Sequence, residues 1–401
     1  MKNKFDQLID RTGTYCTQWD YIEDRFGESD LLPFSISDTD FLCPDEVLQA
    51  LEKRMKHGVF GYTRWNHNEF KGAILNWFRK RFSCEIKEDW VVYSPTVIYS
   101  ISKMIEMLTD EGDHVIIQTP AYDAFFKVIQ DNNRTLSCNQ LIYEDSIYRI
   151  DFDDLEQKLS HKRAKILLLC SPHNPTGRVW TKDELETIIN LCNKHNVFII
   201  SDEIHMDIVF QPNKHIPILN VTTDLNNVFI CSSASKTFNT PGLGGSYAVI
   251  PNEKLREEFL ITLKNRDGLS SASVFGTVAT IEAYNNCEQW VDDLVSYIHK
   301  NLKKIQDFLD EYLPMVKLKI PESTYLAWID VSQLPYTSEQ LQHALVHYAK
   351  VAIMPGETYG DSGEGFIRMN VGCPHSKVVE GLQRLKIAID YLEIDTQDTL
   401  K

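Results

Sequence analysis

Three apolar runs in the middle of the chain each end in polar side chains of the kinds that take part in catalysis. Asn174 follows the first run, Asp202 the second and Lys236 the third. Two hydroxyls, Ser233 and Ser235, stand just before the lysine. Taken singly, each residue has an ordinary structural explanation, because Asn-Pro-Thr-Gly is a favourable turn and most lysines lie at the surface. Together they offer an amine nucleophile, a carboxylate, an amide and hydroxyl donors, a set that suits covalent catalysis with a cofactor.

The same set meets the requirements of pyridoxal 5′-phosphate (PLP). This cofactor needs a lysine for a Schiff base, a carboxylate that keeps its pyridine nitrogen protonated, and donors for its phosphate and its ring hydroxyl. Lys236 is the candidate amine and Asp202 the candidate carboxylate. Ser233 and Ser235 are candidate phosphate donors, and Asn174 is the candidate partner of the ring hydroxyl. The sequence therefore predicts a PLP site built from consecutive strand ends.

The elements that must position these residues are strands and helices in alternation. Continuous apolar segments at 114–118, 165–170, 197–200 and 228–231 predict strands that are covered on both faces. A capping box from Thr181 to Glu184 opens a helical pattern between two of them. This order predicts an α/β domain with a doubly wound, mostly parallel sheet that binds its ligand at the carboxyl ends of the strands.

The last third of the chain has a different pattern. Apolar residues from Trp290 to Tyr312 fit one face of a long helix, which could carry the chain out of the first domain. The remainder, 313–401, mixes short strands with helices and predicts a smaller α+β domain. Periodicity does not decide whether the first 45 residues belong to it.

Composition excludes several classes of protein. The chain has 401 residues, of which 43% are hydrophobic and 24% charged, and a net charge of −16 that disfavours binding to nucleic acid. No run of 18 apolar residues occurs and no apolar segment follows the first charges, so we expect neither a membrane span nor a secretory signal. The nine cysteines form no Cys-x-x-Cys pair, which favours a reducing cytoplasm. We expect no metal at His205, because no third ligand set has suitable spacing.

The polar motifs resemble those of a known family. Asn-Pro-Thr-Gly at 174–177, Asp-Glu-Ile-His at 202–205 and Ser-x-Ser-Lys-Thr-Phe-Asn at 233–239 are similar to the class I/II aminotransferase fold, fold type I of the PLP-dependent enzymes. Within it, the chain resembles the bacterial MalY/PatB-type cystathionine β-lyase / C–S lyase group nearly from end to end. The resemblance implies a large PLP-binding domain over 46–288 and a small domain made of 1–45 and 289–401.

The resemblance also implies contacts with the cofactor outside these strand ends. Tyr122 matches the aromatic that stacks on the ring, and it joins Lys236 among the expected catalytic residues. Val97 and Ile98 match positions whose backbone amides hold the phosphate, and a helix is predicted to start there, where anions bind. His205 is a further cofactor-binding position.

Four residues are implied at the substrate or at a subunit interface. Arg368 matches the arginine that binds the substrate carboxylate through two parallel hydrogen bonds, and Asp38 and Asn174 are expected beside it. Tyr62 matches a tyrosine that reaches the phosphate of the neighbouring subunit. The implied assembly is a homodimer with shared active sites and a small amino-acid substrate.

The chain also departs from the group. Ser35 and Thr39 stand where the group usually has Trp and Met, and both are candidates for the substrate entrance. Thr96 replaces a glycine in the phosphate loop, and His375 replaces an arginine. The stretch 242–245 lacks the arginine that many aminotransferases place after the lysine, a lack that the lyase group shares.

The reaction that the resemblance implies is α,β-elimination from an S-substituted cysteine such as cystathionine, which yields a thiol, pyruvate and ammonia. Lys236 would take the Cα proton and Asp202 would hold the pyridine proton. An aminotransferase on the same fold is one alternative, because Lys236 could instead deliver the proton to the C4′ carbon of the cofactor. A regulatory binding protein that retains the lyase scaffold is another, and a cofactor-free α/β protein is a third.

Overall fold

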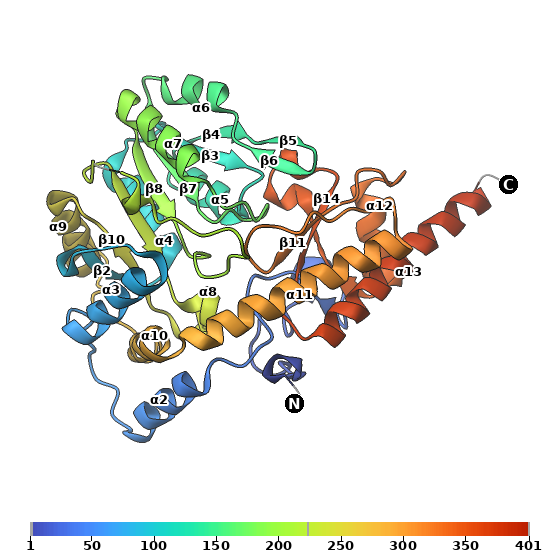
Figure 1. Cartoon of the computed structure of the whole chain (residues 1–401), viewed down its shortest axis with the longest axis horizontal. Helices are drawn as coiled ribbons and strands as arrows, with labels where there is room; N and C mark the ends of the chain where they lie inside the picture. The colour runs from blue at the N-terminus through green and yellow to red at the C-terminus, as the bar shows by residue number, and fades with distance from the viewer. Residues whose placement is uncertain (1–2, 223, 400–401) are drawn as a thin grey trace.

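The computed structural model describes residues 3–222 and 224–399, and a seven-stranded sheet lies at the centre of its larger part (Figure 1). The strand order is β2-β10-β9-β8-β7-β3-β4. Five neighbours, β9, β8, β7, β3 and β4, run parallel, whereas β10 is antiparallel to both β2 and β9. The strands are β2 (Val91–Ser94), β3 (His114–Thr119), β4 (Thr135–Gln140), β7 (Ala164–Cys170), β8 (Phe198–Asp202), β9 (Val228–Ser232) and β10 (Ser246–Val249).

Helices cover both faces of this sheet, which confirms the predicted doubly wound α/β fold. The crossovers between parallel strands place α4 and α5 on one face and α6 and α7 on the other (Figure 1). The predicted capping box is present, since Thr181 and Glu184 each bond the other's backbone at the start of α7. The helices of this part are α2 (Asp45–Lys56), α3 (Asn68–Phe82), α4 (Val97–Leu108), α5 (Asp123–Asp131), α6 (Phe152–Leu159), α7 (Lys182–His195), α8 (Ser235–Phe238), α9 (Glu253–Ile261) and α10 (Val274–Asn286).

The predicted long helix is α11 (Glu288–Tyr312), which runs from α10 toward the smaller part of the molecule (Figure 1). There β11 (Leu326–Asp330), β14 (Phe366–Asn370) and β13 (Met354–Pro355) form an antiparallel sheet. Helices α12 (Ser338–His343) and α13 (His375–Thr399) pack beside it. A hairpin, β5 (Ile142–Glu144) with β6 (Ile147–Arg149), projects from the larger sheet toward this part (Figure 1).

The N-terminal segment is tied to the smaller part. It contains α1 (Glu23–Phe26) and β1 (Leu32–Pro33), and β1 pairs in parallel with β12 (Val351–Ala352). The division into 46–288 against 1–45 plus 289–401 stays a prediction, and this strand pairing favours it. Within the described residues, no helix is both long enough and apolar enough to cross a membrane.

Close packing between α10 and the loop after α8 leads to a stability prediction. A Cβ at Gly276 would lie 2.1 Å from the carbonyl oxygen of Gly244, whereas a Cβ at Gly72 on α3 would meet nothing within 4 Å. We expect Gly276→Ala to lower the free energy of unfolding by about 1–3 kcal/mol through overpacking. Gly72→Ala, the matched control in another helix, should raise it by about 0.5–1 kcal/mol. Thermal and urea unfolding measure both, and equal effects would contradict the packing argument.

Candidate active site

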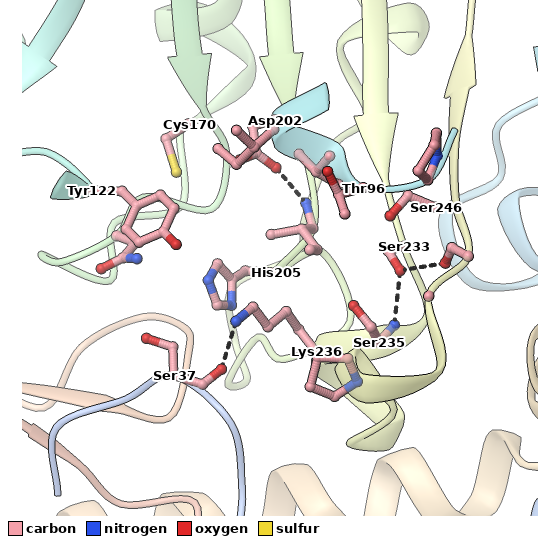
Figure 2. Close-up of a pocket in the computed structure, with 18 residues that line it drawn as sticks. Ser37, Thr96, Tyr122, Cys170, Asp202, His205, Ser233, Ser235, Lys236 and Ser246 are labelled. Carbon is pink, nitrogen blue, oxygen red and sulfur yellow. Dashed lines mark hydrogen bonds between the residues drawn. The ribbon is translucent and has the colours of Figure 1, made fainter. Parts of the chain in front are cut away.

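The carboxyl ends of β7, β8 and β9 open into a cavity of about 170 Å³ (Figure 2). Its lining brings together residues as far apart in the sequence as Ser37 and Ser246. The structure places most of the predicted site residues here: Val97, Ile98, Tyr122, Asn174, Asp202, His205, Ser233, Ser235 and Lys236.

Lys236 lies on the short helix α8 and points into this cavity (Figure 2). Its Nζ donates a hydrogen bond of 2.6 Å to the backbone carbonyl of Ser37. Burial lowers the pKa of Lys236 to about 8, because the charged amine is desolvated; Asp38 opposes this shift and Arg368 adds to it. The amine is therefore much closer to its neutral, nucleophilic form at physiological pH than a surface lysine is.

Asp202 ends β8 on the opposite wall of the cavity from Lys236 (Figure 2). Its Oδ1 accepts from the backbone N–H of Ile204 at 3.1 Å, and desolvation raises its pKa to about 7. The next residue, Glu203, cannot serve in its place. Ser201 Oγ, the Ile218 N–H and His215 Nε2 bind its two oxygens on the other side of the strand.

One side of the cavity suits a phosphate group. The N–H groups of Val97 and Ile98 open α4, where the first turn leaves backbone donors without helical partners. Ser233, Ser235 and Ser246 lie on the same side (Figure 2). Thr96 is the N-cap, because its Oγ1 accepts from Tyr99 N at 3.0 Å in an extended backbone conformation. The replacement of glycine by Thr96 thus leaves the amides in place.

Tyr122, Asp202 and His205 all line the cavity (Figure 2). His205 Nδ1 is buried and has no hydrogen-bond partner among the described residues. Desolvation lowers the pKa of His205 to about 3, so the imidazole is neutral at physiological pH. A neutral imidazole can contact a bound cofactor but carries no charge to balance the phosphate.

Arg368 does not line the cavity itself but reaches its edge from β14. Its guanidinium donates to Asn174 Oδ1 and to the Ser35 carbonyl, both at 3.0 Å, and lies 4.4 Å from the ring centre of Tyr359. Its Nε is buried without a partner, and no described carboxylate forms an ion pair with it. A buried guanidinium without a counter-ion suits the carboxylate of a substrate.

Two further predicted residues, besides Arg368, lie outside the cavity lining. Asp38 Oδ2 is held by Arg11 at 2.6 Å, while its Oδ1 is buried and unpartnered within the described structure. Tyr62 is fully exposed on the loop after α2. Their roles at the substrate and at a neighbouring subunit stay predictions.

Of the departures from the family pattern, Thr96 lines this cavity, whereas Ser35 and Thr39 do not. Ser35 and Thr39 are 2% and 1% exposed, and their place at the substrate entrance stays a prediction. His375 stacks on Tyr297 at 4.0 Å, also away from the lining. Sequence reasoning missed Ser37, Cys170 and Ser246, which do line it. Ser37 contributes a backbone carbonyl, for which the sequence carries no signal.

The residues present fit PLP. A half-buried amine, a buried carboxylate and a helix N-terminus with serines surround one cavity, and three buried polar atoms around it (His205 Nδ1, Arg368 Nε and Asp38 Oδ1) lack partners among the described residues. Such a site on a doubly wound sheet with a smaller second part defines the PLP-dependent fold of the aminotransferase type.

The chain belongs to the aminotransferase class I and II family, whose model matches residues 29–385. It is 47% identical over 385 residues to protein MalY of Escherichia coli, covering 96% of this chain and 98% of MalY. It is 36% identical to cystathionine β-lyase PatB of Bacillus subtilis, covering 96% and 99% of the two chains. The PLP-bound C–S lyase of Staphylococcus hominis superposes with a TM-score of 0.90 at 31% identity, over 97% and 98% of the two chains. The family resemblance of the sequence is confirmed.

The buried carboxyl of Asp202 leads to a prediction on pH and stability. Without cofactor, the folded chain keeps this proton up to about pH 7, whereas the unfolded chain releases it near its ordinary pKa of 3.8. Between these values the folded state binds more protons, so this group's contribution to stability falls as pH rises. We expect cofactor-free Asp202→Asn to be more stable than the wild type above about pH 7 and to lose that advantage near about pH 4.

Thermal unfolding of the cofactor-free chains across this pH range measures the effect. The exposed Asp310→Asn is the control and should follow the wild type throughout. Parallel curves for Asp202→Asn and the wild type would contradict the burial of an ionisable carboxyl at this position.

Proposed function

We propose that this protein is a PLP-dependent carbon–sulfur β-lyase that cleaves cystathionine or related S-substituted cysteines to a thiol, pyruvate and ammonia. The observation that carries the proposal is that Lys236 and Asp202 line one cavity while Arg368 reaches its edge by a hydrogen bond to Asn174, which also lines it. The chain is 36% identical to a cystathionine β-lyase, and its structure is similar to that of a PLP-bound C–S lyase. Both findings favour a lyase over an aminotransferase on the same fold.

When bound, PLP supplies an electron sink for the negative charge that develops at the substrate Cα. Lys236 holds the cofactor through its amine. When not bonded to the cofactor, the Lys236 amine would be the base that takes the Cα proton of the substrate, a task that its lowered pKa favours. Asp202 supplies the negative charge that keeps a proton on the pyridine nitrogen, because an opposite charge favours the protonated ring.

The remaining residues bind and orient. Arg368, which has no described counter-ion, binds the substrate carboxylate, and Asn174 fixes the guanidinium through its Oδ1. Val97, Ile98 and the serines beside Lys236 hold the phosphate. Tyr122 covers one face of the ring. Asp38 and His205 complete the proposed substrate and cofactor contacts.

We further propose that the active unit is a cytoplasmic homodimer with shared sites. Several apolar side chains are exposed side by side around the end of α2: Met55, Val59, Phe60 and Tyr62. This segment stands away from the main body of the chain (Figure 1). Exposed apolar clusters of this kind favour a protein interface, and Tyr62 is the residue that would complete the partner's phosphate site.

Activity assays test the proposed reaction. Purified protein with cystathionine should release pyruvate and thiol without any keto-acid acceptor, which an aminotransferase requires. Lys236→Ala should lower turnover by a factor of at least about 10³, because it removes both the covalent anchor and the base. The exposed Lys182→Ala is the control and should keep wild-type turnover. Substantial elimination by Lys236→Ala, or pyruvate-free turnover that depends on an added keto acid, would refute the proposal.

Mixed dimers test the shared site. A dimer that joins one Lys236→Ala chain to one Tyr62→Phe chain has an intact site only if Tyr62 acts on the partner, since both lesions then fall in the other site. We expect half of the sites to retain cofactor with wild-type affinity. In the Tyr62→Phe homodimer, affinity should fall by about 1 kcal/mol, the worth of one hydrogen bond.

The exposed Tyr15→Phe serves as the control for the loss of a hydroxyl. If every site of the mixed dimer is impaired, Tyr62 acts within its own subunit and the proposal of shared sites fails. A monomer at working concentration would contradict the assembly itself.

A further inference from the structure

The segment 34–41, here called the N-terminal strap, passes beside the cavity and is fixed through its carbonyl groups. The Ser35 carbonyl accepts from Arg368 at 3.0 Å, and Asn370 Nδ2 donates to the carbonyls on either side of Ser37. Farther along, Asn239 Nδ2 donates to the carbonyls at positions 39 and 41. The strap therefore has little freedom to move relative to Lys236 and β14.

One carbonyl of the strap has a different set of partners. The oxygen of Ser37 faces the cavity and accepts from Lys236 Nζ at 2.6 Å and from Tyr325 Oη at 2.9 Å (Figure 2 shows the bond to Lys236). Tyr325 is completely buried and does not line the cavity. Its hydroxyl is linked to Lys236 through the carbonyl to which both side chains donate.

We propose that the Ser37 carbonyl holds the amine of Lys236 whenever that amine is not bonded to the cofactor, and that Tyr325 is the positioning residue that limits how tightly it is held. The proposal rests on the function proposed above for Lys236. The Ser37 carbonyl acts here through a backbone atom, and Tyr325 acts although it does not line the cavity.

The physical reason is competition between two donors for one acceptor. A hydroxyl that donates to the Ser37 oxygen reduces the negative charge available to the ammonium and places a partly positive hydrogen near it. Tyr325 thus weakens the hold on protonated Lys236 and favours the neutral amine, the form that can take the Cα proton. Without the hydroxyl, the carbonyl would bind the ammonium more strongly and keep the lysine charged.

Other charged groups around Lys236 shift its pKa in both directions, and a substitution at Tyr325 leaves these groups in place. Asp38 on the strap and Asp202 on β8 favour the charged amine, whereas Arg368 on β14 disfavours it. His205, whose ring meets that of Tyr325 edge-on at 5.9 Å, is neutral. A substitution at Tyr325 that keeps the ring therefore isolates the contribution of the hydroxyl.

The test measures the protonation of Lys236 directly. Cofactor-free full-length chain is labelled with trace acetic anhydride across a pH series, and mass spectrometry follows acetylation of the Lys236 peptide, because only the neutral amine reacts. We expect Tyr325→Phe to raise the labelling midpoint by about 0.5–1 pH unit. Tyr284→Phe, which removes a buried hydroxyl bonded to Tyr247 at 2.9 Å, is the matched control and should leave the midpoint unchanged.

A second variant should shift the labelling midpoint of Lys236 in the opposite direction. Tyr325→3-fluorotyrosine keeps the shape of the side chain but donates more strongly, so it should lower the midpoint. In the loaded enzyme, the acid limb of the kcat profile should move with the labelling midpoint while KM stays nearly constant. An unchanged or lowered midpoint in Tyr325→Phe, a raised midpoint in the fluorinated variant, or an equal shift in Tyr284→Phe would overturn the proposal. The labelling shift does not depend on pyruvate release, so this proposal and the lyase activity fail separately.

Discussion

β7, β8 and β9 are parallel and in register at their ends, with Cys170 opposite Asp202 and Asp202 opposite Cys231. Because parallel strands end at the same edge, the segments that follow them must start from neighbouring points. This register places Asn174, Asp202 and Lys236 around one cavity, although more than 60 residues separate the first from the last. The amine and the carboxylate meet because the sheet brings them together, and neither has a local sequence reason to face the other.

Burial then gives these groups their chemical properties. Lys236 and Asp202 are largely removed from solvent by the protein around them, and this desolvation lowers the pKa of the amine and raises that of the carboxyl. Both shifts mean that the charged forms of these groups are unfavourable in the cofactor-free site. A cationic ring and an anionic phosphate can relieve this electrostatic penalty. Arg368 adds a buried guanidinium without a described counter-ion. A site of this kind is destabilising for the fold and suited to binding, as expected for catalytic groups.

The smaller part of the molecule completes the site through backbone atoms. The strap, residues 34–41, supplies carbonyl oxygens to Arg368, Lys236 and Asn370, so the position of the strap and the position of these side chains depend on each other. Pairing of β1 with β12 fixes one end of the strap, and Lys377 binds Asp40 near the other. The N-terminal segment thus acts as a wall of the cavity although it carries little regular structure.

The sequence was sufficient to predict four strands of the large sheet, one capped helix and the residue types at the strand ends, because hydrophobic periodicity and caps are local properties. Its motifs also determined the family. The sequence pointed to Asp202 as the carboxylate, but it carries no physical reason why Asp202 and not the neighbouring Glu203 meets the cavity, because side chains alternate across a strand and the packed sheet sets which face does. It gave no sign of the Ser37 carbonyl or of buried Tyr325, because backbone contacts leave no pattern in residue types. Those contacts arise from the folded arrangement, because they depend on how a distant segment lies across the end of the sheet.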